Sequence, residues 1–584
     1  MKKIISMLTA AVIFVGATGF MPLAATFAEV SAAEVTDSGK CGENVSWVLE
    51  NGVLTISGTG DMYCYSFDYS ENSSNAPWSN YCSSIVDIII EDGVTNISDF
   101  AFSCSTSLTS VSIPDGVTSI GAYAFDSCRS LATVTIPDSV TSLKGGAFCL
   151  CTGLSSVTIP DSVTSIEDCT FFECTSLTSI SFSDNVTSIG ERAFCMCEKL
   201  TSVTIPDSVT SIGGGAFAGT SWLEARIAEN PLVIVNNILI DGSAVNGDVV
   251  IPDYVTRLAN FAFAACPGLN SVTIPDSVTS ISDYAFASTT ISSVTIPDSV
   301  TSIGCCAFVD CEKLESITIP NAVTSIGFCA FSDCIELKEV TIPESVTKIG
   351  EYAFSGTPWL EAKIVENPLV IVNNILIDGS TTDGNVVIPD SVMSIGVGAF
   401  SGCESLTSVT IPDGVMSIGG SAFSSCTNLT SVTLPDSVTS IGESAFYDCD
   451  SLISVTINNP TCEIHDEDYT ISEGATIYGF SGSTAEEYAM KYNRTFVSLG
   501  DAPVPTGDIN SDNKTDISDA TIVLNIYAYS AAGMDLSKYT EEQLSAADID
   551  GDGKVSISDA TYILTYYAQN AAGMNPSWED ILKK

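Results

Sequence analysis

The sequence has few basic residues, five tryptophans and a single histidine. Twenty Lys and Arg residues stand against 71 Asp and Glu residues, which gives a formal net charge of −51. A chain this acidic repels phosphate, so nucleic acid is excluded as a partner. The one histidine, His465, confines any Ser–His or Cys–His catalytic pair to the stretch "EIHDED". We expect His465 to be a surface residue or to pack within a cap.

Long apolar runs are absent after the N-terminus. The chain begins "MKKIISMLTAAVIFVGATGFMPLAATFAEVSAAEV", with Lys2 and Lys3 ahead of an apolar run and small residues at Ala28 and Ala33. This pattern predicts a secretory signal peptide over residues 1–33. No later segment is long and apolar enough to span a bilayer, and the tail carries no anchoring signal. We expect a secreted, extracellular protein that is held at a surface only through a partner.

One repeated theme, "SLTSVTIPDSVTSIGxxAFxxC", fills residues 85–457. The residue before the Pro-Asp pair, or its equivalent, recurs in steps of 23 with one step of 22 and two gaps of 46. A fixed period in the twenties predicts a solenoid with one supersecondary unit per turn. In the unit Leu131–Phe148, alternation places Leu131, Val134 and Ile136 inward on a short strand that the Pro137-Asp138 turn ends. Phe148 is expected to point into the same interior.

The repeats resemble the BspA-like class of bacterial leucine-rich repeats, whose units carry the pattern "IPxxVxxIxxxAFxxCxxL". The resemblance covers most of residues 85–457. It implies an α/β repeat solenoid of about 23-residue units. Similar proteins are extracellular or surface-exposed and are associated with adhesion and protein binding, so the resemblance implies an unknown protein or glycan ligand for the solenoid.

Cysteine recurs at one position of the repeat. Ten of the 21 cysteines lie three residues after a repeat phenylalanine: Cys128, Cys151, Cys174, Cys197, Cys266, Cys311, Cys334, Cys403, Cys426 and Cys449. Because they share one structural position, we interpret them as a ladder of buried thiols and not as disulfide pairs. A zinc cluster is the alternative, although paired CxxC knuckles are absent. A persistent thiol ladder in an exported protein fits a reducing or anaerobic habitat, as a hypothesis.

Two double turns interrupt the period. The stretches "TSWLEARIAENPLVIVNNILIDGS" from Thr220 and "TPWLEAKIVENPLVIVNNILIDGS" from Thr357 are nearly identical and lie 137 residues apart. Trp222 and Trp359 open them. One interpretation is that the two stretches form a pair of spaced docking protrusions. We favour the other interpretation, an inherited large-scale duplication in which the tryptophans are buried.

The ends of the solenoid need covers, because an open repeat face is apolar and its strand edges are unpaired. Residues 34–84 predict an N-terminal β cap with a hairpin around Asn51 and Gly52. Residues 458–500 predict a C-terminal cap in which a strand is followed by a short helix. The stretch "DAPVPTG", residues 501–507, predicts a linker to a different domain.

That domain, residues 508–584, begins with "DINSDNKTDISDATIVL" and repeats it 40 residues later as "DIDGDGKVSISDATYIL". Alternate oxygen ligands on a twelve-residue loop can converge on calcium, which needs six to eight oxygens. The predicted ligands are Asp508, Asn510, Asp512, Lys514 through its carbonyl, Asp516 and Asp519 in the first loop, and Asp548, Asp550, Asp552, Lys554 through its carbonyl, Ser556 and Asp559 in the second. The loops depart from the EF-hand pattern, since position 12 is Asp and no strong helix precedes either loop.

The two loop-helix units resemble a type I dockerin. The resemblance implies a small all-α calcium-binding domain holding two calcium ions, and a calcium-dependent partner, the cohesin module of a scaffold protein in a cellulosome. In that family, positions 10 and 11 of each loop help choose the cohesin. Here they are Ile517 with Ser518 and Ile557 with Ser558, identical in both copies. The identity suggests that the domain can bind in either of two orientations.

A catalytic function is the alternative to binding, because the proteins that carry a dockerin are commonly polysaccharide-degrading enzymes. A glycosidase needs two carboxylates, but the repeated Asp after each proline suits a turn and gives no singular pair. Nothing resembles a hydrolase fold. We expect a non-catalytic protein-binding or adhesion solenoid tethered to a cellulosome scaffold and linked to polysaccharide breakdown by context. The alternative is a cellulosomal carbohydrate-active enzyme or carbohydrate-binding component with an unrecognised site.

Overall fold

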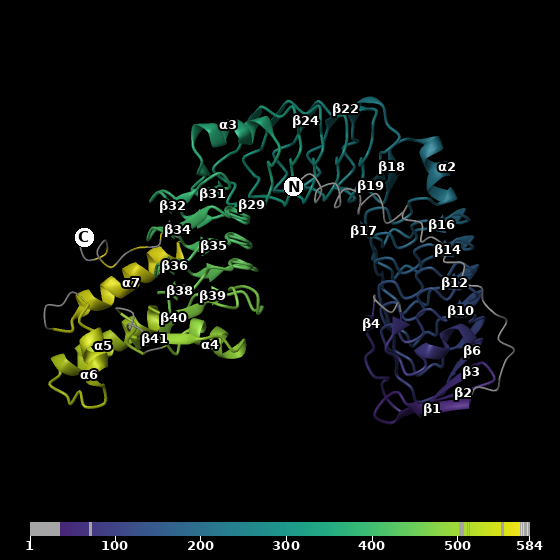
Figure 1. Ribbon diagram of the computed structural model, residues 1–584, viewed down its shortest axis with the longest axis horizontal. Coiled ribbons are helices and arrows are strands. Elements are labelled where there is room, and N and C mark those ends of the chain that lie inside the picture. The colour runs from purple at the N-terminus through teal and green to yellow at the C-terminus, as the bar shows by residue number, and fades with distance from the viewer. Residues whose placement is uncertain are drawn as a thin grey trace. The chain divides into compact units, whose positions relative to one another are not determined.

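A computed structural model of the chain describes residues 36–68, 73–501, 507–510, 512, 514–549, 554–572, 574, 576, 578 and 581. The predicted signal peptide, 1–33, and most of the predicted linker lie outside these residues. The chain forms two compact units, residues 1–314 and 315–584. Within each unit the repeats stack as successive coils (Figure 1). Among the described residues, no helix is long and apolar enough to cross a membrane.

Each coil of the first unit contributes two short strands, one to each of two parallel series. The longer series is β6 (Asp87–Ile90), β8 (Ser110–Ser112), β10 (Thr133–Thr135), β12 (Ser156–Thr158), β14 (Ser179–Ser181), β16 (Ser202–Thr204), β20 (Gly247–Val250), β22 (Leu269–Thr273) and β24 (Ser293–Thr295). The shorter series is β7 (Asn96–Ile97), β9 (Ser119–Ile120), β11 (Ser142–Leu143), β13 (Ser165–Ile166), β15 (Ser188–Ile189), β17 (Ser211–Ile212), β21 (Arg257–Leu258), β23 (Ser280–Ile281) and β25 (Ser302–Ile303).

The strands pair in register with the repeat. Thr133 faces Ser156 and Ser142 faces Ser119, each 23 positions apart, in parallel pairs. Leu131, Val134 and Ile136 are buried, as the alternation predicts. The Pro-Asp turn is also confirmed, since the N–H of Val140 donates to the carbonyl of Pro137 at 3.0 Å. The coil of about 23 residues is therefore the physical unit of this solenoid.

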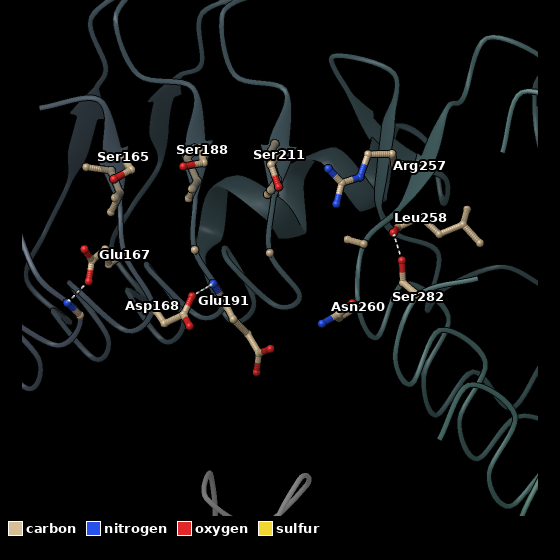
Figure 2. Close-up of a pocket in the computed structure, with 17 residues that line it drawn as sticks. Ser165, Glu167, Asp168, Ser188, Glu191, Ser211, Arg257, Leu258, Asn260 and Ser282 are labelled. Atoms are coloured by element: carbon tan, nitrogen blue, oxygen red, sulfur yellow. Dashed lines mark hydrogen bonds between the residues drawn. The ribbon is translucent and has the colours of Figure 1, made fainter. Parts of the chain in front are cut away.

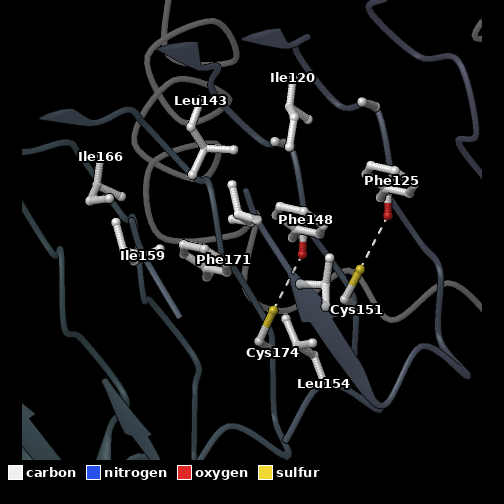
Figure 3. Packing of buried hydrophobic residues seen from close by; sticks show 14 of the residues in the cluster. Ile120, Phe125, Leu143, Phe148, Cys151, Leu154, Ile159, Ile166, Phe171 and Cys174 are labelled. Carbon is white, nitrogen blue, oxygen red and sulfur yellow. Dashed lines mark hydrogen bonds between the residues drawn. The ribbon is translucent and has the colours of Figure 1, made fainter. Parts of the chain in front are cut away.

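A column of stacked phenylalanines forms the interior of the coils (Figure 3). The ring centroid of Phe148 lies 5.2 Å from that of Phe125 and 5.7 Å from that of Phe171, with nearly parallel planes. All three rings are fully buried. Since a single coil offers only one apolar face, each ring is covered by the rings of its two neighbours.

The cysteine ladder lies beside this column, and its burial is confirmed. Cys151 donates its thiol proton to the carbonyl of Phe125 at 3.1 Å, and Cys174 donates to Phe148 at 3.3 Å (Figure 3). The same bond to the phenylalanine of the preceding coil recurs from Cys197, Cys426 and Cys449. All 21 cysteines lie among the described residues, and each is a free thiol there. The ladder thus supplies hydrogen-bond donors to backbone carbonyls inside the core.

The two ends of the repeats are covered by strands that extend the longer series. At the N-terminal end, β1 (Thr36–Lys40), β2 (Val45–Glu50) and β3 (Val53–Gly58) form an antiparallel group, and β3 pairs with β6 in parallel. The predicted hairpin around Asn51 joins β2 to β3. The hairpin of β4 (Phe67–Asp68) and β5 (Ser73–Ser74) and the 3-10 helix η1 (Ser79–Ser84) complete this end.

The second unit also contains a longer and a shorter series of strands. The longer one is β26 (Ser316–Thr318), β28 (Glu339–Thr341), β32 (Gly384–Val387), β34 (Leu406–Thr410), β36 (Ser431–Leu434) and β38 (Ser454–Ile457). The shorter one is β27 (Ser325–Ile326), β29 (Lys348–Ile349), β33 (Ser394–Ile395), β35 (Ser417–Ile418), β37 (Ser440–Ile441) and β39 (Glu463–Ile464). The expected strand and short helix follow as β40 (Thr476–Ser481) and α4 (Thr484–Lys491), and then β41 (Phe496–Asp501) pairs with β40.

Each double turn replaces part of a coil with a helix and a hairpin. The first contains α2 (Ser221–Glu229), β18 (Val233–Val235) and β19 (Ile238–Asp241), and the second contains α3 (Pro358–Glu366), β30 (Val370–Val372) and β31 (Ile375–Asp378). Trp222 packs on Phe217 with centroids 4.9 Å apart, and Trp359 packs on Phe354 at 4.7 Å. Both indoles are buried. The interpretation of buried tryptophans is confirmed, and the helical part of this α/β solenoid lies in these insertions.

The C-terminal segment forms a small all-α domain, the two-loop domain, with helices α5 (Ile517–Ala531), α6 (Glu541–Ala546) and α7 (Ile557–Ala571). Its core repeats itself at the 40-residue spacing of the two loops. Ile509 and Ile549 precede the helices, Ala520 matches Ala560, and Val523 matches Ile563, all of them buried. The domain therefore has a hydrophobic core of its own.

The phenylalanine column predicts a large effect for one truncation. Replacement of Phe148 by Ala removes a fully buried ring and leaves a cavity that the stacked coils cannot close, which costs about 3–5 kcal/mol of unfolding free energy. Chemical denaturation measures the loss. Thr135→Ala, at an exposed strand position, is the control and should change stability by less than about 0.5 kcal/mol. Equal stability of Phe148→Ala and the control would contradict the packing described here.

The thiol ladder predicts a loss of stability at alkaline pH. Burial raises the pKa of Cys449 to about 11 and that of Cys403 to about 12, from an ordinary value of 9.0. Between about pH 9 and pH 11 the thiols of the unfolded chain ionise while the folded thiols stay protonated, so the free energy of unfolding falls as the pH rises. Urea denaturation across this range measures the slope. A Cys403→Ser, Cys449→Ser double variant should show a shallower slope, and an identical slope would refute the effect.

Candidate functional site

The first acidic loop is organised around a buried carboxylate at its twelfth position. Asp519, at the third residue of α5, is fully buried. Its Oδ1 accepts the N–H groups of Ile509 at 2.8 Å and Asn510 at 3.2 Å, and its Oδ2 accepts that of Asp516 at 2.9 Å. One side chain thus connects the start of the loop to the start of the helix, and the loop is closed on itself.

The other predicted ligands of this loop face one another across short turns. The N–H of Asp512 lies 3.2 Å from Oδ1 of Asp508 and 2.9 Å from Oδ1 of Asn510, while the N–H of Lys514 donates to Asp512 at 3.0 Å. Asp516 caps α5 by accepting the hydroxyl and the N–H of Ser518. These bonds hold the pKa of Asp516 below its ordinary value.

The second loop repeats the arrangement where it is described. Asp559 is fully buried and accepts the N–H of Ile549 at 2.8 Å and that of Ser556 at 2.7 Å. Ser556 caps α7. Asp548 and Lys554 are described, whereas Asp550 and Asp552 lie outside the described residues. The two loops share one design, in which Asp at position 12 is bound by the backbone at both ends of the loop.

The donor set of the loops suits a hard cation. Carboxylates, an amide oxygen and a backbone carbonyl are the ligand types that calcium prefers. Within the described residues, no three His, Cys, Asp or Glu side chains are gathered closely enough to hold a metal. At Asp519 the two carboxylate oxygens hold three N–H groups. These neutral donors satisfy its hydrogen bonds but do not balance its buried negative charge. A bound cation would supply the opposite charge.

The predicted partner residues lie at matching surface positions. Ile517 is 55% exposed and Ile557 is 54% exposed, and each is followed by an exposed serine, Ser518 and Ser558. Leu524 and Leu564 lie seven residues further on and are also exposed. The spacing of i and i+7 places each leucine on the same helix face as its isoleucine.

A groove on the first unit is a second candidate site (Figure 2). Its cavity volume is about 670 Å³, and it crosses the coils that flank the first double turn. Ser165, Ser188 and Ser211 form a row along the shorter strands, and Arg257 stands at the end of this row (Figure 2). The signal in the sequence is "VTRL", where most other coils have "VTSI".

Internal partners occupy the carboxylates of this groove. Glu167 accepts the ammonium of Lys144 at 3.2 Å and the N–H of Gly145 at 2.9 Å. Asp168 accepts the N–H of Glu191 at 2.6 Å (Figure 2), and Glu191 lies 3.7 Å from the guanidinium of Arg192. The contacts of Glu167 and Asp168 join one coil to the next.

Two family models match the chain. The model of the BspA type leucine rich repeat region matches residues 76–174, 118–246, 242–361 and 380–477. The model of the dockerin type I domain matches residues 506–566. No match was found among curated proteins.

Solved bacterial repeat structures are similar to the chain as well. A leucine-rich repeat protein from Eubacterium ventriosum is 21% identical, with a TM-score of 0.31 over 56% of this chain and 95% of that chain. One from Bacteroides ovatus is 19% identical, with a TM-score of 0.28 over 78% and 100% of the two chains. A leucine rich cell surface protein from Faecalibacterium prausnitzii is 25% identical, with a TM-score of 0.25 over 76% and 97%. The family models, and not these superpositions, identify the repeats.

The loop geometry predicts one tight calcium ion in each loop. Asp508→Ala and Asp548→Ala each remove the predicted first ligand of one loop, so each variant of the full chain should bind one ion, against two expected for the parent. Calorimetric titration with calcium measures the number of sites. Asp535→Ala removes an acid of the same domain whose carboxylate accepts the N–H and the hydroxyl of Ser537, and it should leave both sites intact. A parent chain that binds no calcium would contradict the assignment of both loops.

Proposed function

We propose, from the premise that this chain belongs to the BspA-type leucine-rich repeat family and ends in a type I dockerin domain, that it is a secreted, non-catalytic binding solenoid attached to a scaffold protein. The dockerin implies a cohesin partner and a calcium-dependent, cellulosome-type assembly. The repeats imply protein binding. The joint presence of both regions in one chain is the observation that carries the proposal.

The duplicated loops support two calcium ions per dockerin. In this proposal Asp508, Asn510, Asp512, Asp516 and Asp519 hold the first ion with the carbonyl of Lys514. Asp548, Asp550, Asp552, Ser556 and Asp559 hold the second ion with the carbonyl of Lys554. Calcium supplies positive charge, and the chain's own residues order the loop ends against α5 and α7.

The cohesin is proposed to contact the exposed start of either helix. Ile517 with Ser518 and Ile557 with Ser558 offer an apolar side chain next to a hydroxyl, which suits a contact with a hydrophobic centre and a polar edge. The equal exposure of the two isoleucines supports an interface that either copy can form. Leu524 and Leu564 extend the apolar strip in each copy.

The absence of catalysis is also proposed, and three observations support it. The carboxylates of the groove at Arg257 bind backbone N–H groups and cations of neighbouring coils. His465 is exposed and lies 3.8 Å from Glu467, with no serine or cysteine hydrogen-bonded to its ring among the described residues. The repeated Asp138 and its equivalents follow proline in turns and are exposed. Polysaccharide breakdown would then be linked to this protein through the assembly that it joins.

The proposal predicts how the full chain binds a cohesin module. Binding should occur in calcium and disappear in chelator. Ile517→Asp with Ser518→Ala, or Ile557→Asp with Ser558→Ala, should leave the affinity within about threefold, because the other copy still binds. The variant with all four changes should lose about a hundredfold or more, since buried apolar anchors dominate such interfaces. Surface plasmon resonance on immobilised cohesin gives these affinities.

The matched control is Ile335→Asp, because Ile335 lies in the repeats and is also 55% exposed. It should bind cohesin like the parent. A four-residue variant that binds normally would remove the proposed interface. Release of reducing sugars from plant polysaccharide, lost on substitution of a single carboxylate, would instead favour the carbohydrate-active alternative.

A further inference from the structure

A cavity of about 600 Å³ lies where the last coil of the repeats meets the C-terminal cap. It is lined by the turn after Phe446, by the loop between β39 and β40, and by the end of α4. Its lining residues lie outside the dockerin and outside the groove at Arg257, and Cys449 of the thiol ladder is among them. Its size falls within the usual range for ligand sites.

Two tyrosines form an aromatic corner in this cavity. The ring centroids of Tyr447 and Tyr469 lie 6.0 Å apart, with an angle of 79° between the ring planes. Tyr447 is 49% exposed and Tyr469 is 40% exposed, although each is next in the chain to a fully buried residue, Phe446 before Tyr447 and Thr470 after Tyr469. Exposed tyrosine faces at a right angle favour a cation, which the ring quadrupole attracts.

Three carboxylates of the same cavity are available to a ligand. Asp450, Asp468 and Glu473 line the cavity and are exposed. Among the described residues, none of these three carboxylates takes part in a salt bridge or a side-chain hydrogen bond. This sets them apart from Asp448, which accepts the hydroxyl of Ser425 at 3.5 Å, and from the occupied acids of the groove at Arg257.

The basic residues of the cavity already have partners. Lys491 donates to Asp466 at 2.5 Å and lies over the ring of Tyr492. Arg494 donates from Nη2 to the backbone carbonyl of Asp468. The cavity therefore offers more negative than positive charge to an incoming group, next to two accessible aromatic rings.

We propose that this cavity binds a lysine or arginine side chain on a protein partner of the solenoid. The aromatic corner would receive the alkyl chain and the charged head, and Asp450, Asp468 and Glu473 would neutralise the charge. The net charge of −51 on the whole chain attracts a basic partner toward this surface. The inference deepens the proposed protein-binding function and rests on it, since it states the chemistry of the partner.

The test uses the full chain and two peptides, acetyl-Gly-Arg-Gly-Arg-Gly-amide and the same peptide with citrulline in place of arginine. Citrulline keeps the shape of arginine but carries no charge. Calorimetry should give an affinity for the arginine peptide roughly tenfold higher than for the citrulline peptide. This difference should shrink between about 50 mM and about 300 mM salt, because the carboxylates are solvent-exposed. Equal affinities for the two peptides would overturn the proposal.

Substitutions in the cavity test whether the arginine peptide binds there. Tyr447→Ala, and Asp450→Asn with Glu473→Gln, should each reduce affinity for the arginine peptide by about tenfold. The controls are Tyr254→Ala, which changes an exposed tyrosine far from Tyr447 in the sequence, and Asp413→Asn, which changes an exposed acid of a repeat turn. Both variants should bind the arginine peptide like the parent. Because the substituted side chains are largely exposed, all variants should keep the parent's melting temperature. Parent-like peptide binding by the cavity variants would overturn the proposal.

Two further measurements separate this inference from the proposed function. Cohesin binding by the same variants should be unchanged, so failure of the parent to bind cohesin would contradict the dockerin assignment alone. Cellohexaose is the neutral probe. If it binds the parent and is lost in Tyr447→Ala while the arginine peptide does not bind, the cavity is a glycan site and the proposal is wrong.

Discussion

The stacking of one phenylalanine per coil is the interaction on which the rest of the solenoid depends. Strands of two to five residues, such as β9 and β22, are too short to be stable alone. A coil buries its apolar face only when the next coil covers it, as Phe125, Phe148 and Phe171 show. Stability in such a chain comes from contacts between neighbouring units, which explains why both ends need covering strands and helices.

The same stacking determines where the polar groups are placed. The residues two positions before and two positions after the buried phenylalanines of the column adopt positive φ angles that favour glycine, yet Tyr123, Ser127 and Leu150 occupy such positions. Their N–H groups donate to carbonyls of the next coil at 2.7 to 3.1 Å. The thiols of the cysteine ladder donate in the opposite direction, to the preceding coil. Backbone strain within a coil is thus offset by hydrogen bonds between coils.

The solenoid and the dockerin are stabilised by different contacts. The dockerin has its own small core and two loops closed by buried aspartates, so its structure depends on local contacts more than on contacts with the repeats. The solenoid offers a long surface on which side chains can change without disturbing the core. Arg257 in the groove and Tyr447 at the last coil are side chains that differ in this way from those of other coils, since the pattern of buried residues continues beneath them.

The sequence by itself determined the period, the strand alternation, the buried thiol position and the paired acidic loops, because each depends on residue types at fixed spacing. It predicted the burial of Trp222 and Trp359 but not the helices that bury them. The cavity between Tyr447 and Tyr469, the positive φ angles at Tyr123 and Leu150, and the engagement of Glu167 and Asp168 were decided only by the tertiary structure. These features arise when residues 20 or more positions apart come together across coils, and the residue pattern of a single coil does not specify such contacts.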